Sequence, residues 1–143
     1  MFIHQISVFV ENKSGALSGI TGALAEAGID IRALSIADTT DFGILRLIAG
    51  DPDRAFAVLR EAGFTVSRTE VIGVRMDDKA GALHNVLELL NRADIALEYV
   101  YAFLTRKSGS AYVILRVKDN AKAAAALEAG GVELLEASEV YGI

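Results

Sequence analysis

The sequence predicts an α+β protein made of two tandem copies of one small unit, each with the element order β-α-β-β-α-β. Three observations predict this fold class. The segment 8–17 returns 66 residues later as 74–83, which indicates a duplicated domain because it occurs only twice. Apolar residues change between strand-like and helix-like spacing within each half. With 143 residues, the chain has room for two small domains, which we place at 1–69 and 70–143.

The first unit can be followed along the chain. Ile6, Val8 and Val10 alternate with other residues, which predicts a half-buried strand. Apolar side chains at helical spacing follow from residue 16, and Asp51-Pro52 is typical of a helix start. We expect, in order, a strand at 6–10, a helix at 16–27, strands at 29–37 and 42–49, a helix at 52–62 and a strand at 64–68.

The second unit repeats this order with a longer hairpin. Its first helix places Leu83, Val86 and Leu90 at helical spacing. We expect its second strand at 95–104, an alanine-rich helix at 121–129 and a last strand from Val132. The motif Ile-Leu-Arg at 44–46 and at 114–116 indicates that the offset grows from 66 to 70. This order is the ferredoxin-like split βαβ topology, an antiparallel sheet with its helices on one face.

The end of the chain imitates the start of the second unit. Residues 139–143 (EVYGI) match residues 70–74 (EVIGV) in pattern. We expect an extra C-terminal strand that pairs along an exposed sheet edge, in the same chain or in a partner, since covered edges do not aggregate. The alternative is a frayed tail.

Composition limits the possible functions. Hydrophobic residues make up 52% of the chain, but no apolar stretch is long enough to span a membrane. The N-terminus lacks a signal-peptide pattern, and cysteine is absent; we expect a cytoplasmic protein without thiol chemistry. The net charge is -5, and both halves are acidic, so the basic face that nucleic-acid binding needs is missing.

A short motif stands between the first strand and first helix of each unit. It reads Asn/Asp-Lys-x-Gly-Ala-Leu at 12–17 and at 78–83. Together with the topology, this motif resembles the ACT domain family of small regulatory modules, over nearly the whole chain. The stretch 33–46 is similar to that of stand-alone tandem ACT proteins. Ser14 and Ala80 stand where many members have proline.

The resemblance implies that each loop binds an amino acid or related metabolite. A helix N-terminus favours a carboxylate, glycine permits close approach, and Asn12 or Asp78 can accept a hydrogen bond from an ammonium group. The alternative is that both residues are ordinary helix caps. The acidic pair Asp77-Asp78 makes the second loop less favourable for a carboxylate. The predicted ligand-binding residues are Asn12, Lys13, Ser14, Gly15, Ala16, Leu17, Ile36, Asp78, Gly81 and Leu83.

In ACT proteins such a loop usually faces a second strand of another domain. Second-strand candidates for the pocket wall are Ser35, Ile36 and Ala37 in the first unit and Tyr99, Tyr101 and Phe103 in the second. The aromatic stripe is more typical of a core or an interface. Arg46 and Arg116 are expected on the open sheet face, in exposed salt bridges or as a clamp for an anion.

The sequence offers little catalytic chemistry. It has only two histidines, His4 and His84, the second expected on the surface, and no metal-ligand spacing or phosphate-binding glycine motif. We expect a non-enzyme without cofactor or metal: an amino-acid-binding regulatory or sensor protein. The alternative is a non-catalytic interaction module that serves as regulatory subunit of a separate amino-acid metabolic enzyme. Small domains and spare sheet surface favour a homodimer.

Overall fold

The computed structural model describes residues 2–104 and 108–142. The first unit contains β1 (Ile3–Glu11), α1 (Ala16–Glu26), β2 (Ile31–Asp38), β3 (Phe42–Ala49), α2 (Pro52–Glu61) and the first half of β4 (Thr65–Asp77). The second unit contains the rest of β4, α3 (Ala82–Arg92), β5 (Tyr99–Ala102), β6 (Ser110–Arg116), α4 (Asn120–Ala129) and β7 (Glu133–Leu134), and α5 (Ala137–Tyr141) follows. This confirms the predicted α+β fold class with two βαββαβ units.

The two units share one strand. β4 pairs antiparallel with β1 through residues 65–71 and with β6 through residues 72–77. The predicted strand 64–68 and the opening strand of the second unit therefore form one 13-residue strand, which crosses the predicted boundary at 69/70. The resulting sheet has the order β2-β3-β1-β4-β6-β5, with β7 also on β4.

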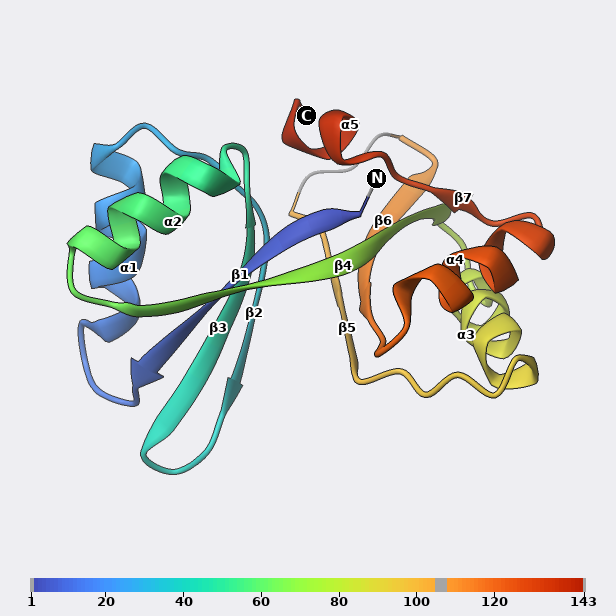
Figure 1. Ribbon diagram of the computed structural model, residues 1–143, viewed down its shortest axis with the longest axis horizontal. Helices are drawn as coiled ribbons and strands as arrows, with labels where there is room; N and C mark the ends of the chain where they lie inside the picture. Colours follow the sequence, from blue (N-terminus) through green and yellow to red (C-terminus); the bar gives the residue numbers. More distant parts are fainter. Residues whose placement is uncertain (1, 105–107, 143) are drawn as a thin grey trace.

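Each half of the sheet has its own helix-covered core. In Figure 1, α1 and α2 lie on one flank of the sheet, and α3 and α4 lie on the other. In the first unit, Ile6, Val8 and Leu45 pack against Ile20 and Leu24 of α1. Equivalent packing in the second unit places α3 and α4 over the apolar side chains of β4 and β6. The apolar residues that were predicted at helical spacing therefore form the buried faces of these helices.

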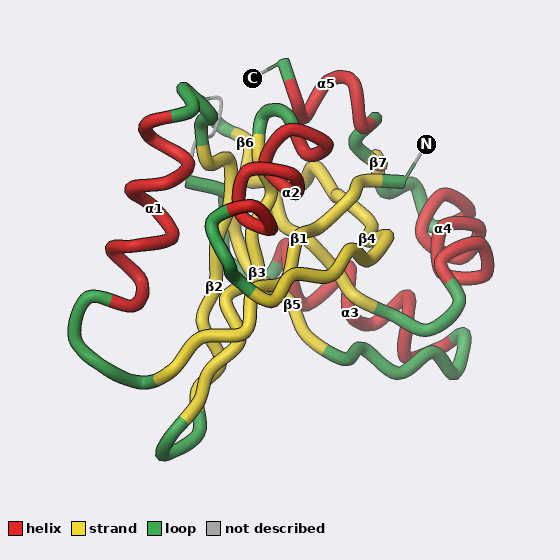
Figure 2. The backbone as a smooth tube through the Cα atoms, turned by 60° about the vertical axis from the view of Figure 1, so that its left-hand side comes forward, coloured by secondary structure: helices red, strands yellow, loops and turns green. Residues whose placement is uncertain are grey.

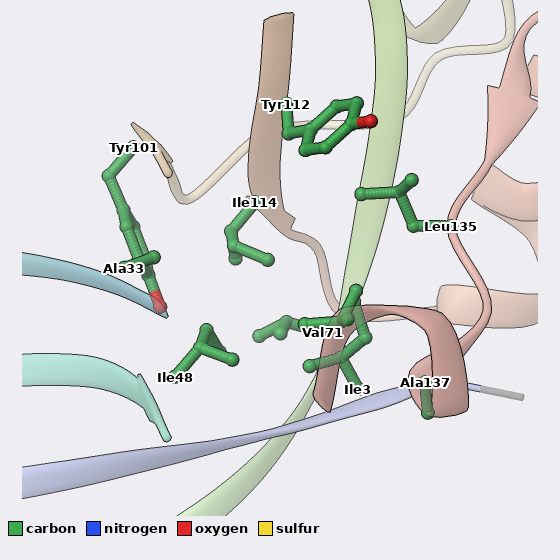
Figure 3. Close-up of a cluster of buried hydrophobic side chains, with 10 residues drawn as sticks. Ile3, Ala33, Ile48, Val71, Tyr101, Tyr112, Ile114, Leu135 and Ala137 are labelled. Carbon is green, nitrogen blue, oxygen red and sulfur yellow. The ribbon is translucent and has the colours of Figure 1, made fainter. Parts of the chain in front are cut away.

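The open faces of the two half-sheets pack against each other. Ile3, Ile48 and Val71 of the first half meet Tyr101 and Ile114 of the second in a buried cluster (Figure 3). The sequence predicted that one face of each sheet is available to a partner. Near the middle of the molecule, the two half-sheets of the same chain cover each other.

The outer strands also meet. Ala33 of β2 forms an isolated antiparallel bridge with Phe103, just after β5. The N–H of Leu104 donates to the carbonyl of Arg32 at 2.9 Å. The strand predicted at 95–104 is shortened to Tyr99–Ala102, and its continuation joins the two edges of the sheet.

The register of the third strands corrects the predicted alignment. Ser7 pairs with Arg46, and its repeat equivalent Gly73 pairs with Ile114. Arg46 therefore corresponds to Ile114, and the offset between the two third strands is 68 residues rather than 70. The expected equivalence of Arg46 and Arg116 is wrong, because the recurring Ile-Leu-Arg letters fall two residues out of register.

The C-terminal prediction is also wrong. Residues 137–141 form helix α5 instead of an edge strand; residue 143 lies outside the described residues. Ala137 and Val140, three positions apart, lie on the same helix face and are buried in the cluster between the half-sheets. Tyr141 fastens the helix, since its hydroxyl accepts a 2.9 Å hydrogen bond from the N–H of His4. Burial of an apolar helix face therefore outweighs the strand-like sequence. Figure 2 shows α5 beside the start of β1.

Candidate functional site

The first loop begins its helix with a glycine. Gly15 is the N-cap of α1, and its φ of 85° lies in the left-handed region that glycine adopts without strain. No side chain among the described residues forms a capping hydrogen bond to this helix. The interpretation of Asn12 as an ordinary cap is therefore wrong. The N–H of Ala16 donates to the carbonyl of Lys13 at 3.3 Å, which leaves the N–H groups of Leu17 and Ser18 available for a ligand.

Asn12 instead fixes the loop to the neighbouring turn. Its backbone N–H donates to the carbonyl of Asp41 at 2.8 Å, and its side-chain Nδ2 donates to the carbonyl of Thr40 at 3.2 Å. Both acceptors lie in the turn between β2 and β3. This arrangement directs the donor end of the Asn12 amide toward the turn and leaves its Oδ1 as an acceptor.

A cavity of about 190 Å³ lies beside this loop. Of the predicted site residues, Asn12, Lys13, Ala16, Leu17 and Ile36 line it. Leu17 is 37% exposed and Ile36 is 46% exposed, so their apolar side chains are accessible at its wall. The structure thus brings the loop and the second strand of the same unit together. Ser14 and Gly15 belong to the loop but do not line this cavity.

A second cavity of about 310 Å³ adjoins the first. It shares Lys13 and Ala16 with its neighbour, and Phe9, Phe42 and Phe64 supply aromatic walls. Sequence reasoning missed Phe9 and Phe64, whereas the apolar surroundings that it expected for the ligand include Phe42. Phe42 pairs in register with Glu11 at the end of β1, a placement that the short predicted turn at 38–41 could have revealed.

The second loop has the same backbone conformation as the first, but different side chains line the cavity beside it. Gly81 is the N-cap of α3 with a φ of 88°, so Asp78 is not the N-cap residue of this helix. The cavity beside this loop, about 440 Å³, is lined by Arg75, Lys79 and Glu133 among others, and not by Asp78, Gly81 or Leu83. Leu83 packs instead against the core of the second unit.

The cavities of about 310 Å³ and 440 Å³ lie at equivalent positions in the two units. Nine residues line the one in the first unit, and all nine repeat equivalents line the one in the second. The chemistry differs, because Phe9 is replaced by Arg75, Phe42 by Ser110 and Thr65 by Glu133. The cavity in the first unit therefore has aromatic walls, whereas the corresponding positions in the second unit are polar or charged.

The aromatic stripe of β5 belongs to the interface between the half-sheets. Tyr101 is buried there, and Tyr99 and Phe103 pack against the same cluster. Gln5 is fully buried; its Nε2 donates to the hydroxyl of Tyr99 at 2.8 Å, and its Oε1 accepts from the hydroxyl of Tyr101 at 2.7 Å. Burial raises the pKa of Tyr101, and the nearby Tyr99 raises it further, while Arg46 opposes the shift.

Both predicted arginines lie on the open sheet face. The guanidinium of Arg46 stacks 3.8 Å from the ring centroid of Tyr99, which joins the two half-sheets. Arg116 forms an ion pair with Glu98, with 3.2 Å between Nε and the carboxylate oxygen. Arg116 therefore has the salt bridge that the sequence favoured, whereas Arg46 has an aromatic partner.

Residues 2–104 and 108–142 contain no group of three or more His, Asp or Glu side chains that could hold a metal ion. His84 is exposed on α3. Among the described residues, every helix is too short or too polar to cross a membrane.

Comparison with known proteins agrees with this architecture. Protein BT0572 from Bacteroides thetaiotaomicron has a solved structure that is 38% identical, with a TM-score of 0.93 over 100% of this chain and 98% of that one. The regulatory subunit of aspartate kinase from Thermus thermophilus, in ligand-free form, is 15% identical with a TM-score of 0.66, over 90% of this chain and 93% of that one. The corresponding Thermus flavus subunit is 16% identical with a TM-score of 0.64, over 92% of both chains.

The two Thermus structures are too distant in sequence to show more than a common fold. No curated protein matches the chain. A family model described as an ACT domain pair matches residues 1–138, which include both loops and both half-sheets. The chain therefore belongs to the ACT domain family, as an ACT domain pair.

Proposed function

We propose that this protein is a regulatory sensor that binds a free amino acid beside the loop at residues 12–17. The observation that carries the proposal is the combination of the uncapped N-terminus of α1 with an adjoining cavity whose wall includes Leu17 and Ile36. The N–H groups of the first helical turn favour the α-carboxylate of the ligand, because they carry partial positive charge.

The same cavity offers acceptors for the α-ammonium group. The Oδ1 atom of Asn12 remains as an acceptor, since its Nδ2 donates to Thr40. Carboxylates of Glu11 and Asp38 also line the cavity. Lys13 is 3.0 Å from the carboxylate of Glu11 and can exchange this exposed ion pair for a ligand carboxylate at little cost.

The side chain of the ligand would meet apolar residues. Val10, Leu17 and Ile36 lie on the cavity wall, and the adjoining cavity adds Phe9 and Phe42. Contact with these side chains favours a branched-chain or aromatic amino acid over a charged one. The second loop is a weaker candidate for such a ligand, because Arg75, Ser110 and Glu133 replace the apolar and aromatic wall beside its cavity.

The output of such a sensor passes to a separate protein. The matched family model describes a pair of ACT domains, and we infer that the protein is not an enzyme. A second candidate function is a non-catalytic subunit that regulates an amino-acid metabolic enzyme through protein contact alone. Its support is the common fold with regulatory subunits of aspartate kinase.

Thermal unfolding of the purified protein with each of the twenty amino acids tests the proposal. A ligand at 100 times its dissociation constant adds about 2.7 kcal/mol to the free energy of unfolding, which gives a clear rise in Tm. Gly15→Val and Gly81→Val are matched variants, because the two glycines have φ values of 85° and 88° and an added Cβ meets no atom within 4 Å at either. Each variant is compared with its own ligand-free Tm.

We expect the Tm shift to disappear in Gly15→Val and to remain in Gly81→Val. Leu17→Asp should also abolish it, while Leu104→Asp, at an apolar side chain that is 62% exposed, should not. Absence of a shift with all twenty amino acids would refute amino-acid binding and favour the subunit that acts by contact alone. A shift that survives in Gly15→Val would exclude the first loop as the site.

A further inference from the structure

Three phenylalanines from separate parts of the first unit meet at one cavity. Phe9 belongs to β1, Phe42 begins β3 and Phe64 follows the turn after α2. All three line the cavity of about 310 Å³, which we call the aromatic cavity. The ring centroids of Phe9 and Phe42 are 5.1 Å apart. Phe9 is 50% exposed and Phe42 is 45% exposed, so part of each ring is accessible to a molecule in the cavity.

The third ring is positioned by a glycine of α1. A Cβ at Gly19 would lie 3.6 Å from Cζ of Phe64, so the tip of this ring packs against the helix where no side chain stands. Phe64 also packs against the buried core of the first unit. Its ring is therefore held in place by the fold before any ligand binds, which lowers the entropic cost of binding.

The second unit provides an internal comparison for the aromatic cavity. The equivalents of Phe9, Gly19, Phe42 and Phe64 all line the cavity beside the second loop, and none of them is aromatic. In chain order they are Arg75, Asn85, Ser110 and Val132. The second unit thus has the same fold without the three rings, so the fold does not require them. Their convergence on one cavity therefore supports a role in binding.

The aromatic cavity adjoins the proposed amino-acid site. Val10, Glu11, Lys13 and Ala16 line both this cavity and the cavity of about 190 Å³. Ala16, at the start of α1, has a single methyl group as its side chain and leaves space at this border. An amino acid whose α-carboxylate and α-ammonium groups lie in the smaller cavity can extend its side chain past Ala16 toward the rings.

We propose that the aromatic cavity binds the side chain of the ligand and makes the protein selective for amino acids with an aromatic ring. This inference rests on the proposed function, because it assigns the ligand class of the same site. Aromatic rings attract one another in tilted and edge-to-face arrangements beyond the effect of buried area, whereas aliphatic side chains do not. This difference corresponds to about tenfold tighter binding of phenylalanine than of leucine.

Isothermal titration calorimetry with L-phenylalanine and L-leucine tests the proposal. The wild type should bind phenylalanine about tenfold more tightly, and Phe9→Leu and Phe42→Leu should each reduce this ratio to about threefold or less. Both rings are about half exposed, so neither substitution should prevent folding, which thermal unfolding checks. Phe56→Leu is the matched control, because Phe56 packs against the same core but lines a different cavity. It should leave the ratio unchanged.

L-Tryptophan provides an optical measurement of where the ring binds. The chain contains no tryptophan, so indole fluorescence comes from the ligand alone. Binding should shift the emission to shorter wavelength, because the indole ring leaves water for a cavity with aromatic walls. The shift should be smaller in Phe42→Ser, which carries the residue of the second unit. Bound tryptophan that emits at the wavelength of free tryptophan would show a ring in water and overturn the proposal.

The calorimetric outcomes separate this inference from the proposed function. Leucine that binds as tightly as phenylalanine would overturn the aromatic selectivity and leave an amino-acid sensor. A tenfold ratio that persists in both Phe9→Leu and Phe42→Leu would show that the side chain binds elsewhere, and this would also overturn the inference. Absence of binding by all twenty amino acids would instead refute the proposed function, and the inference with it.

Discussion

Tyr101 and Gln5 join the two half-sheets through one buried hydrogen bond. The hydroxyl of Tyr101 donates to Oε1 of Gln5 at 2.7 Å, although the two residues stand 96 positions apart in the chain. Gln5 is the one buried polar residue of the described core, and its Nε2 also donates to the hydroxyls of Tyr99 and Ser7. A polar group in this position selects one relative placement of the half-sheets, because any shift would leave the buried amide unsatisfied.

Replacing Tyr101 with phenylalanine removes this bond. Tyr101→Phe should lower the free energy of unfolding at neutral pH by about 1–3 kcal/mol, the usual effect of leaving a buried acceptor without a donor. Urea denaturation followed by circular dichroism measures the change. Gln5→Leu/Tyr101→Phe removes both polar partners and should be less destabilised than the sum of the two single variants. Additive losses would show that the bond does not couple the two residues.

The stability difference between wild type and Tyr101→Phe should depend on pH. Burial raises the pKa of Tyr101 above its ordinary value of 10.0, so the folded state holds the hydroxyl proton more tightly than the unfolded state. This contribution is fully present below pH 10 and is lost as the pH rises above it. The advantage of the wild type should shrink by about 1.4 kcal/mol per pH unit above pH 10. A constant difference between pH 7 and 11.5 would contradict the raised pKa.

Helix α5 should contribute to the stability of both units. Val140 is fully buried in the cluster between the half-sheets, so Val140→Ala should cost about 2 kcal/mol through lost burial and a residual cavity. Ser138→Ala, on the exposed side of the same helix, should change the free energy of unfolding by less than about 0.5 kcal/mol. Equal effects of the two substitutions in urea denaturation would show that α5 is not packed as described.

Local patterns made much of the fold predictable. The strand expected at 42–49 has the same bounds as β3, and the Asp51-Pro52 signal marks the start of α2, where Asp51 accepts a 3.1 Å hydrogen bond from the N–H of Arg54. Asp119 caps α4 in the same way. The two capping residues are 68 positions apart, which is the offset between the third strands of the two units. The recurring Ile-Leu-Arg motif wrongly indicated an offset of 70.

Features that depend on distant contacts could not be predicted. The terminal segment repeats a strand-like pattern, yet tertiary burial of Ala137 and Val140 makes it a helix. The merging of two predicted strands into β4 depends on packing between units, and no local signal records it. Within the candidate site, the motif at 12–17 could be found from sequence, but Phe9 and Phe42 become neighbours only through strand register.

Gly73, near the centre of β4, is closely packed by side chains of both units. An added Cβ there would lie 2.5 Å from Cδ1 of Ile3 and 3.1 Å from Cβ of Leu135, and both neighbours are buried. Gly73→Ala should therefore destabilise the protein by roughly 1–3 kcal/mol through overpacking where the two units join. Gly22→Ala is the matched control, because Gly22 lies inside α1 and a Cβ there meets no atom within 4 Å. It should stabilise the protein by up to about 1 kcal/mol through helix propensity. Opposite signs in urea denaturation would establish close packing at the junction, whereas a neutral Gly73→Ala would show that Ile3 and Leu135 can move apart.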